Sequence, residues 1–176
     1  MKKLFSLLLI VAIASSFTLL KNTIIRSAIT FQIKNMGIGT GGTIGGLQAD
    51  IQFKPADLAS SSIEASVDVN TINTDNSSRD DHLKSDDFFD VAHYPKIILK
   101  SVLLKHKSGS NYTGTFNLTI RGKTKQVEMP FTYTEKENSQ AFKGTFKINR
   151  LDYGVGGTSL VLSDDVTVNI DVECGK

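Results

Sequence analysis

The chain has 176 residues, a formal net charge of +2 at neutral pH and no tryptophan. Its 20 basic and 18 acidic side chains are scattered, so the chain lacks the strong positive field that attracts nucleic acid. The single cysteine, Cys174, excludes an internal disulfide bond, and we interpret it as a small apolar residue of a strand.

The N-terminus has the pattern of a secretory signal peptide. Lys2 and Lys3 precede an apolar run over residues 4–14, which ends in an Ala-x-Ala cleavage pattern. The run is too short to span a bilayer. We therefore predict cleavage after Ala14, export to the periplasm or beyond the cell, and a single mature domain over residues 15–176 without a membrane span. An uncleaved N-terminal anchor is the alternative.

The mature region alternates apolar and polar residues with a period of two, which is typical of half-buried β-strands. Short polar turns separate several of these runs, so their strands should be antiparallel neighbours in a sandwich or an up-and-down barrel. We predict an all-β, antiparallel, eight-stranded barrel, because closure removes edge strands. The eight runs cover residues 29–33, 47–53, 63–69, 97–103, 112–121, 127–133, 142–148 and 166–172.

Glycines interrupt this pattern at informative places. Gly114 and Gly144 each precede a phenylalanine, Phe116 or Phe146, on the same face of a strand. A small residue beside a large ring indicates either a hollow interior or a sharply curved strand, and the sequence leaves both open. The glycine-rich residues 37–46 lack the spacing of a phosphate-binding loop, and we interpret them as an entrance loop or a bulged strand start.

Residues 79–95 (RDDHLKSDDFFDVAHYP) combine many charges with aromatic rings between two strand-like regions. Asn76, Ser77 or Ser78 can cap a short helix whose first turn holds acidic residues, which suits the helix dipole. The segment is therefore predicted to be a lid that covers the end of the barrel with its apolar side chains. These lid residues are Leu83, Phe88, Phe89 and Tyr94.

Catalytic patterns are scarce. Asp80, Asp81 and His82 lie together, but the chain lacks the ligand spacing of known zinc and calcium motifs. It also lacks a nucleophile elbow, and Cys174 has no histidine near it in sequence. We therefore predict a protein that is not an enzyme and that has no metal and no cofactor other than a bound lipid.

Five segments, including the predicted lid, occur in an order and at a spacing that match a known family. They are residues 71–74 (TINT), 79–95, 118–125 (LTIRGKTK), 149–154 (NRLDYG) and 165–166 (DV). In these segments the chain resembles the YceI-like family of polyisoprenoid-binding proteins, and the resemblance covers essentially the whole mature region. It implies a lipocalin-like antiparallel barrel, exported to the periplasm, that encloses an apolar tunnel for an isoprenoid or a related amphiphilic lipid. The ligand itself need not transfer, because fold does not fix ligand.

The tunnel hypothesis names the large apolar residues on the inward faces of the strands. Its lining residues are Phe31, Ile33, Leu99, Phe116, Phe131, Phe146 and Val168.

Three cationic side chains near the lid, Arg79, His82 and Arg150, are suited to a polar or phosphorylated headgroup. The interpretation we prefer is that Arg79 pairs with Asp80, and Arg150 with Asp152, to pin the lid. The predicted partner is a lipid-like small molecule, and a homodimer is an open alternative to a monomer. A structural or interaction module with a filled barrel, or a lipid-modifying enzyme, is the rival class of function.

Overall fold

The computed structural model describes residues 22–176, so the predicted signal peptide over residues 1–14 lies outside the described residues. The short elements are the helix α1 (Ser77–Lys84) and the 3₁₀ turns η1 (Leu58–Ser60), η2 (Val69–Thr71) and η3 (Arg150–Tyr153). No helix within residues 22–176 is both long and apolar enough to cross a membrane. The strands are β1 (Ile24–Asn35), β2 (Ile38–Thr43), β3 (Gln48–Gln52), β4 (Ser62–Asp68), β5 (Lys96–Ser108), β6 (Asn111–Ile120), β7 (Lys123–Glu135), β8 (Ser139–Asn149) and β9 (Leu162–Gly175).

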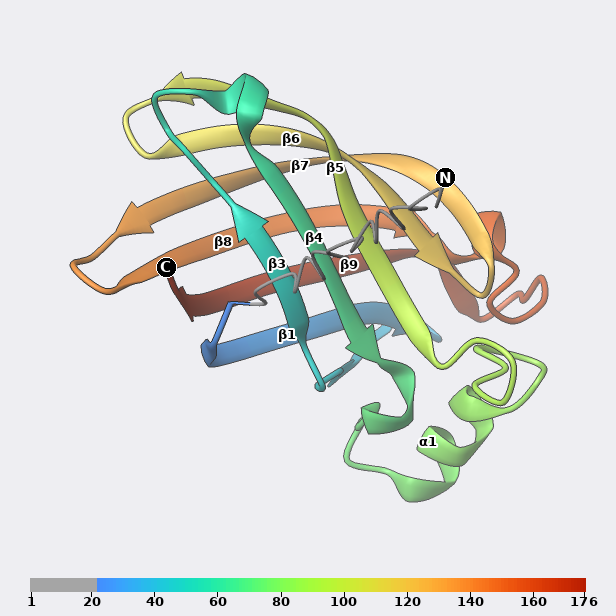
Figure 1. Ribbon diagram of the computed structural model, residues 1–176. Helices are drawn as coiled ribbons and strands as arrows, with labels where there is room; N and C mark the ends of the chain where they lie inside the picture. Colours follow the sequence, from blue (N-terminus) through green and yellow to red (C-terminus); the bar gives the residue numbers. More distant parts are fainter. Residues whose placement is uncertain (1–21) are drawn as a thin grey trace, which may run out of the picture.

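All these strands form one antiparallel sheet in the order β2-β1-β9-β8-β7-β6-β5-β4-β3. The sheet curls into a half-barrel, with β3 and β4 crossing in front of the long strands and α1 at one end (Figure 1). The all-β antiparallel fold predicted from the sequence is thus confirmed, with two differences. The sheet has nine strands rather than eight, and it ends at β2 and β3 instead of closing completely.

The additional strand is β2, which lies in the glycine-rich stretch that we interpreted as an entrance loop or a bulged strand start. Its sequence, IGTGGT, has too few apolar side chains to show an alternating pattern. Gly41 and Gly42 are required by close approach, because a Cβ atom on them would lie 2.5 Å from the backbone oxygens of Phe31 and Asn73 respectively. A Cβ atom on Gly42 would lie 2.8 Å from Cζ of Phe31, its cross-strand partner on β1, so the ring covers the glycine.

Asn22 links β3 to β9 across the open seam, and an isolated bridge between Thr43 and Asn73 crosses the seam near β2. The backbone N–H of Asn22 donates to the Ala49 carbonyl of β3 at 3.0 Å, and its Oδ1 accepts from the Ile51 N–H at 2.6 Å. Its side-chain amide donates to the Gly175 carbonyl at the end of β9, at 2.9 Å. Asn22 therefore ties the edge strand β3 to β9 across a gap that has no strand ladder.

Local sequence explains how the lid and its neighbouring turn form. Asn76 is the helix cap, because its Oδ1 accepts from the Arg79 N–H at 3.0 Å, which confirms one of the three caps considered. Arg121 and Gly122 form the two-residue turn between β6 and β7, with φ values of 48° and 70°. Such left-handed pairs match the twist of a hairpin.

An apolar cavity between an aromatic cluster and a lid

The concave side of the sheet holds an apolar cavity of about 120 Å³. Both sides of the seam contribute to it, since β1 and β3 each supply lining residues. Among the described residues that line it, Ser66 alone has a polar side chain. The lining residues are Ile29, Leu47, Ala49, Ile51, Ile63, Ala65, Ser66, Val67, Ile97, Leu99, Phe116, Leu118, Met129, Phe131, Phe142, Gly144, Phe146, Val168, Ile170 and Val172.

The structure brings most of the predicted tunnel residues together at this cavity. Five of the seven line it: Leu99, Phe116, Phe131, Phe146 and Val168. The cross-strand pair Phe146 and Val168 shows why alternation succeeded, because opposite residues of neighbouring strands share a face. Their contact with a ligand stays a prediction.

Phe31 and Ile33, the other two predicted lining residues, lie outside the cavity lining. Both are half-buried on β1, where they pair with Gly42 and Thr40 of the edge strand β2. The Phe31 ring is used to cover Gly42, and a Cβ atom on that glycine would lie equally close to the Thr74 methyl group. Because Gly42 has no side chain, the ring of Phe31 lies over it at the edge of the sheet.

The glycines on the inward face do not leave open space. A Cβ atom on Gly114 would overlap the ring of Phe116, which therefore occupies the position of the missing side chain. A Cβ atom on Gly144 would lie 2.9 Å from the sulfur of Met129, although Gly144 also lines the cavity. Neighbouring side chains thus fill most of the room that these glycines create.

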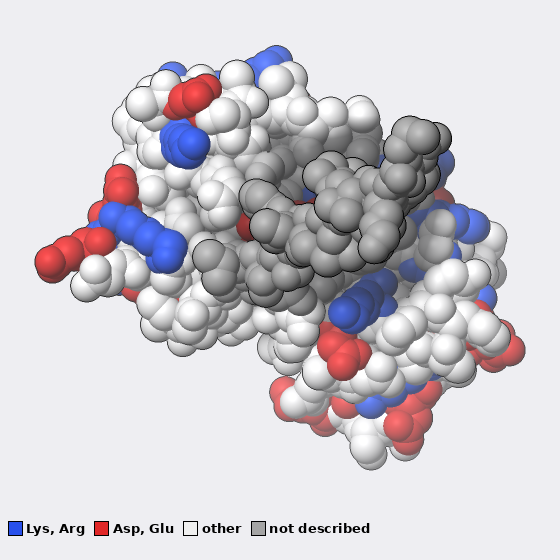
Figure 2. All heavy atoms as spheres, in the orientation of Figure 1, with Lys and Arg blue, Asp and Glu red and all other residues white. Residues whose placement is uncertain are grey.

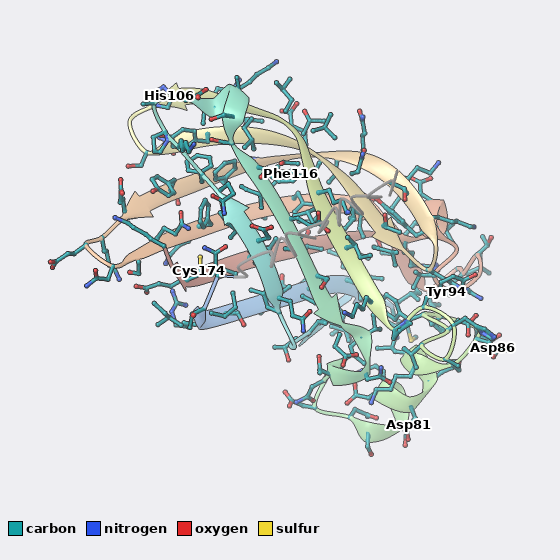
Figure 3. The ribbon with its side chains drawn as sticks, viewed as in Figure 1. Asp81, Asp86, Tyr94, His106, Phe116 and Cys174 are labelled. Carbon is teal, nitrogen blue, oxygen red and sulfur yellow. The ribbon has the colours of Figure 1, made fainter. Side chains whose placement is uncertain are left out.

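Five interlocked aromatic rings close the end of the barrel opposite the lid. This aromatic cluster consists of Phe53, which directly follows β3, and four rings of β6, β7 and β8: Tyr112, Phe131, Tyr133 and Phe142. The Phe53 ring centroid lies 4.6–5.9 Å from each of the other four centroids. His106 marks this end in Figure 3 and Tyr94 marks the lid end, with Phe116 between them.

The predicted lid residues pack at the opposite end without lining the cavity. Phe88 and Phe89 are partly buried against the core, and the ring of exposed His82 meets the Phe88 ring edge-on at 4.9 Å. Tyr94 is 39% exposed and lies over Gly122 of the β6–β7 turn. Leu83 is half-buried on α1. A gating role for these four residues stays a prediction.

Arg121 fastens the lid, a role that the sequence did not reveal. Its guanidinium donates to the carbonyl oxygens of Asp86 in the lid and Gly154 after η3. The Gly156 N–H adds a bond to the Asp87 carbonyl at 3.0 Å. Nothing in the sequence around Arg121 indicates these partners, and only the three-dimensional proximity of the loops brings them together.

The predicted cation pairs have other partners in the structure. Arg79 and Asp80 both bind Thr74: Nε of Arg79 donates to the threonine hydroxyl at 2.7 Å, and the Asp80 carboxylate accepts from that hydroxyl at 2.6 Å. The two side chains therefore hold the chain before α1. The Nε2 of His82 lies 3.9 Å from the carboxylate of exposed Asp87.

Arg150 is 3% exposed and contacts Asp164, at 2.9 Å, rather than the expected Asp152. Its remaining donors bind backbone carbonyl groups of the loop after η3 and of the first residues of β9, including those of Val155 and Ser163. Asp152 itself is exposed in η3. The guanidinium therefore organises the loop, because its bonded donors all face the protein.

The titration properties of the described residues reflect packing and surface pairing. Burial raises the pKa of Tyr153 to about 12 and raises the pKa of the Cys174 thiol. Hydrogen bonds lower the pKa of Asp171, first from Arg26 and then from Lys143, and these side chains tie β9 to β1 and β8. Among residues 22–176, no group of three or more His, Cys, Asp or Glu side chains is arranged so that it could hold a metal ion.

Charges on the visible face of the molecule are scattered and of both signs, including on the lobe that contains the lid (Figure 2). This distribution matches the net charge of +2 and leaves the apolar cavity as the distinctive feature. A curled antiparallel half-barrel with an apolar interior and a short helix at one end defines a lipocalin-like barrel.

Comparison with known proteins gives the family. The YceI-like domain matches residues 24–174, so the chain belongs to the YceI-like family. Among similar relatives, a UPF0312 protein of Pseudomonas syringae pv. tomato is 28% identical over 149 residues, which are 79% of this chain and 78% of that protein. A UPF0312 protein of Yersinia pestis is 26% identical and covers 82% of this chain and 79% of that protein.

Solved structures share the fold. The crystal structure of Burkholderia cenocepacia BcnA superposes with a TM-score of 0.79 at 26% identity, and covers 84% of this chain and 95% of that chain. The YceI protein of Campylobacter jejuni gives 0.70 at 27% identity, covering 77% and 84%. A domain of Saccharophagus degradans, described as polyisoprenoid-binding, gives 0.69 at 14% identity, covering 88% and 97%. At that identity, the last likeness shows the fold alone.

Proposed function

We propose that the chain is an exported binding protein that shelters the tail of a polyisoprenoid or a similar amphiphilic lipid inside its half-barrel. The apolar cavity carries this proposal, because a hydrocarbon tail gains about 0.8 kcal/mol for each methylene removed from water. The family membership and the polyisoprenoid-binding neighbour support the same ligand class. The signal-peptide pattern over residues 1–14 supports export.

The lining argues for a ligand whose polar head stays outside. No cavity-lining residue within the described chain carries a charge, so a buried charged head would lose its hydration without compensation. The donors of Arg79 and Arg150 that could have met such a head are bonded to Thr74 and to the η3–β9 segment. We therefore favour an uncharged tail in the cavity and a solvated head.

The cavity must expand to hold a long tail. Its volume of about 120 Å³ is close to that of an engineered cavity of ~150 Å³ that accepts benzene, and it is smaller than the ~300–1,000 Å³ of typical ligand pockets. The seam offers a way to gain room, since β3 is an edge strand that pairs with β4 alone and is otherwise tied by Asn22. Movement of β3 would widen the cavity while the ladders from β1 to β9 and on to β4 stay intact.

Extraction of native protein tests the proposal. The protein is expressed with residues 1–14 intact, purified from the exported fraction, and extracted with organic solvent for mass spectrometry. Recovery of a prenyl or acyl lipid near one molecule per chain supports the proposal, and the same preparation of a cavity-filled variant, Ala65→Leu, should carry much less. Native protein that repeatedly yields no lipid, and that takes up none from vesicles, would contradict it.

The small cavity also supports a second candidate, an interaction module with an essentially filled barrel. That function needs no ligand, and it predicts that filling the remaining space changes partner binding little. The sign of the stability change when Ala65→Leu fills the cavity separates the two candidates.

A further inference from the structure

The aromatic cluster forms one end of the cavity. Phe131 and Phe142 belong to both, since they line the cavity and their rings form part of the cluster. Phe53, Tyr112 and Tyr133 lie outside the cavity lining. The rings of Phe131 and Phe142 therefore form the floor of the cavity, and the other three rings lie behind this floor.

Phe53 is the centre of that support. Its centroid lies 5.9 Å from that of Phe131 and 5.5 Å from that of Phe142, so it contacts both floor rings. It also contacts Tyr112 at 5.2 Å and Tyr133 at 4.6 Å. Its ring is 8% exposed, and the residue directly follows the edge strand β3. Phe53 thus fills the space between the four other rings that close this end of the barrel, which come from three other strands.

We propose that Phe53 sets the maximum tail length that the barrel accepts, so that it is the specificity-determining residue for chain length. This inference rests on the proposed function, because it assumes that a tail enters the cavity. A tail that advances towards the aromatic cluster meets the rings of Phe131 and Phe142. These rings cannot turn aside while Phe53 fills the space behind them, since close-packed interiors admit no further methylenes without strain. Tail atoms beyond this point stay in water and add no affinity.

Phe53 differs from Phe131 and Phe142 because its ring is not part of the cavity wall. Removing Phe131 or Phe142 would alter the cavity wall itself and change affinity for every tail. Removing Phe53 leaves the wall residues in place and opens space behind them. The affinity for short tails should then stay the same, while that for long tails should rise.

A series of straight-chain alcohols measures the limit. Octanol, decanol, dodecanol, tetradecanol, hexadecanol and octadecanol are each used to displace a fluorescent apolar dye from the full mature protein. For wild type, affinity should rise roughly four-fold for each added methylene and then level off at one chain length. For Phe53→Ala the same rise should continue for several further carbons, so the longest alcohols gain at least ten-fold in affinity while octanol changes less than two-fold.

Two controls separate chain-length specificity from lost stability. Ile72→Ala removes buried apolar volume directly after η2, outside the core cluster that holds the aromatic rings, and should leave the plateau at the wild-type length. Phe53→Leu keeps much of the buried volume and should shift the plateau less than Phe53→Ala does, which provides a measurement if the alanine variant does not fold. An unchanged plateau in both Phe53 variants would overturn the inference while alcohol binding upheld the proposed function. Failure of wild type to bind any alcohol would refute the proposed function and the inference with it.

Discussion

Whether the half-barrel holds usable space can be decided by filling it with one side chain. Ala49 and Ala65 face each other across β3 and β4, and Ala65 pairs with Leu99 on its other side. All three residues line the cavity. Ala65→Leu adds three carbon atoms at a place where the wall is lined by two of the smallest side chains. The variant therefore projects into the cavity of about 120 Å³ without removing any existing contact.

The expected magnitude follows from the apolar volume that the new side chain displaces. If three methylenes of a bound tail are excluded, the loss is about 3 × 0.8, or ~2.4 kcal/mol, which corresponds to a roughly 60-fold weaker affinity. The free energy of unfolding should stay the same or rise, because the added carbons bury themselves in space that is already apolar. A filled barrel predicts the opposite sign, since overpacking a tight core typically costs about 1–3 kcal/mol.

The two quantities are measured on the same preparation, affinity by dye displacement with dodecanol and stability by urea unfolding. Ser62→Leu is the matched control, because Ser62 is exposed on the same strand and its side chain points away from the cavity. This control should change affinity by less than two-fold. If Ala65→Leu is destabilised by a kilocalorie or more and still binds dodecanol like wild type, the cavity reasoning is wrong.

Three further outcomes follow from named contacts. Arg121→Asn keeps a residue type that tolerates the left-handed turn but removes the bonds to Asp86 and Gly154, so backbone amides of residues 86–90 should exchange hydrogen at least ten-fold faster, while those of β9 do not change. The lowered pKa of Asp171 contributes stability that is present above its unfolded-state pKa and is lost as pH falls through the folded-state value; Asp171→Asn should therefore flatten the acid side of the curve of unfolding free energy against pH, and an unchanged slope would count against the pairing with Arg26. Burial and a raised pKa should make native Cys174 react with a disulfide reagent at least about ten-fold more slowly than the urea-unfolded chain, and equal rates would show that the end of β9 is open.

The strand content was readable from sequence because half-buried strands show their two faces as a period of two. Phe142, Gly144, Phe146 and Ile148 alternate with polar residues, and β8 covers all of them. The same signal failed for β2, where glycines provide backbone pairing without side chains to mark a face. The ring of Phe31 covers Gly42 of that strand, a contact that a one-dimensional pattern does not reveal.

The fastening of the lid was less predictable than its position. The acidic and aromatic composition placed a lid near residues 79–95, and Asn76 was a recognisable cap. The contacts of Arg121 and Arg150, however, are mostly with backbone carbonyl groups that are distant in sequence or lie within an irregular loop. Every residue carries a carbonyl group, so sequence cannot show which of them an arginine meets. The only partners that the sequence suggested were carboxylates close to each arginine along the chain. For Arg150 this suggested Asp152, whereas the structure has Asp164.

Alternation also predicts which side chains face inwards but not how much space remains between them. Gly114 and Phe116 share an inward face, which allowed either a void or a filled interior. The structure shows the ring of Phe116 over Gly114. The ring therefore fills the space that the glycine leaves on the same strand. Where two small residues instead face each other, as Ala49 and Ala65 do, both line the cavity. The hollow part of such a barrel is therefore determined by cross-strand pairs of small residues, and the register that creates those pairs emerges only when the strands are assembled.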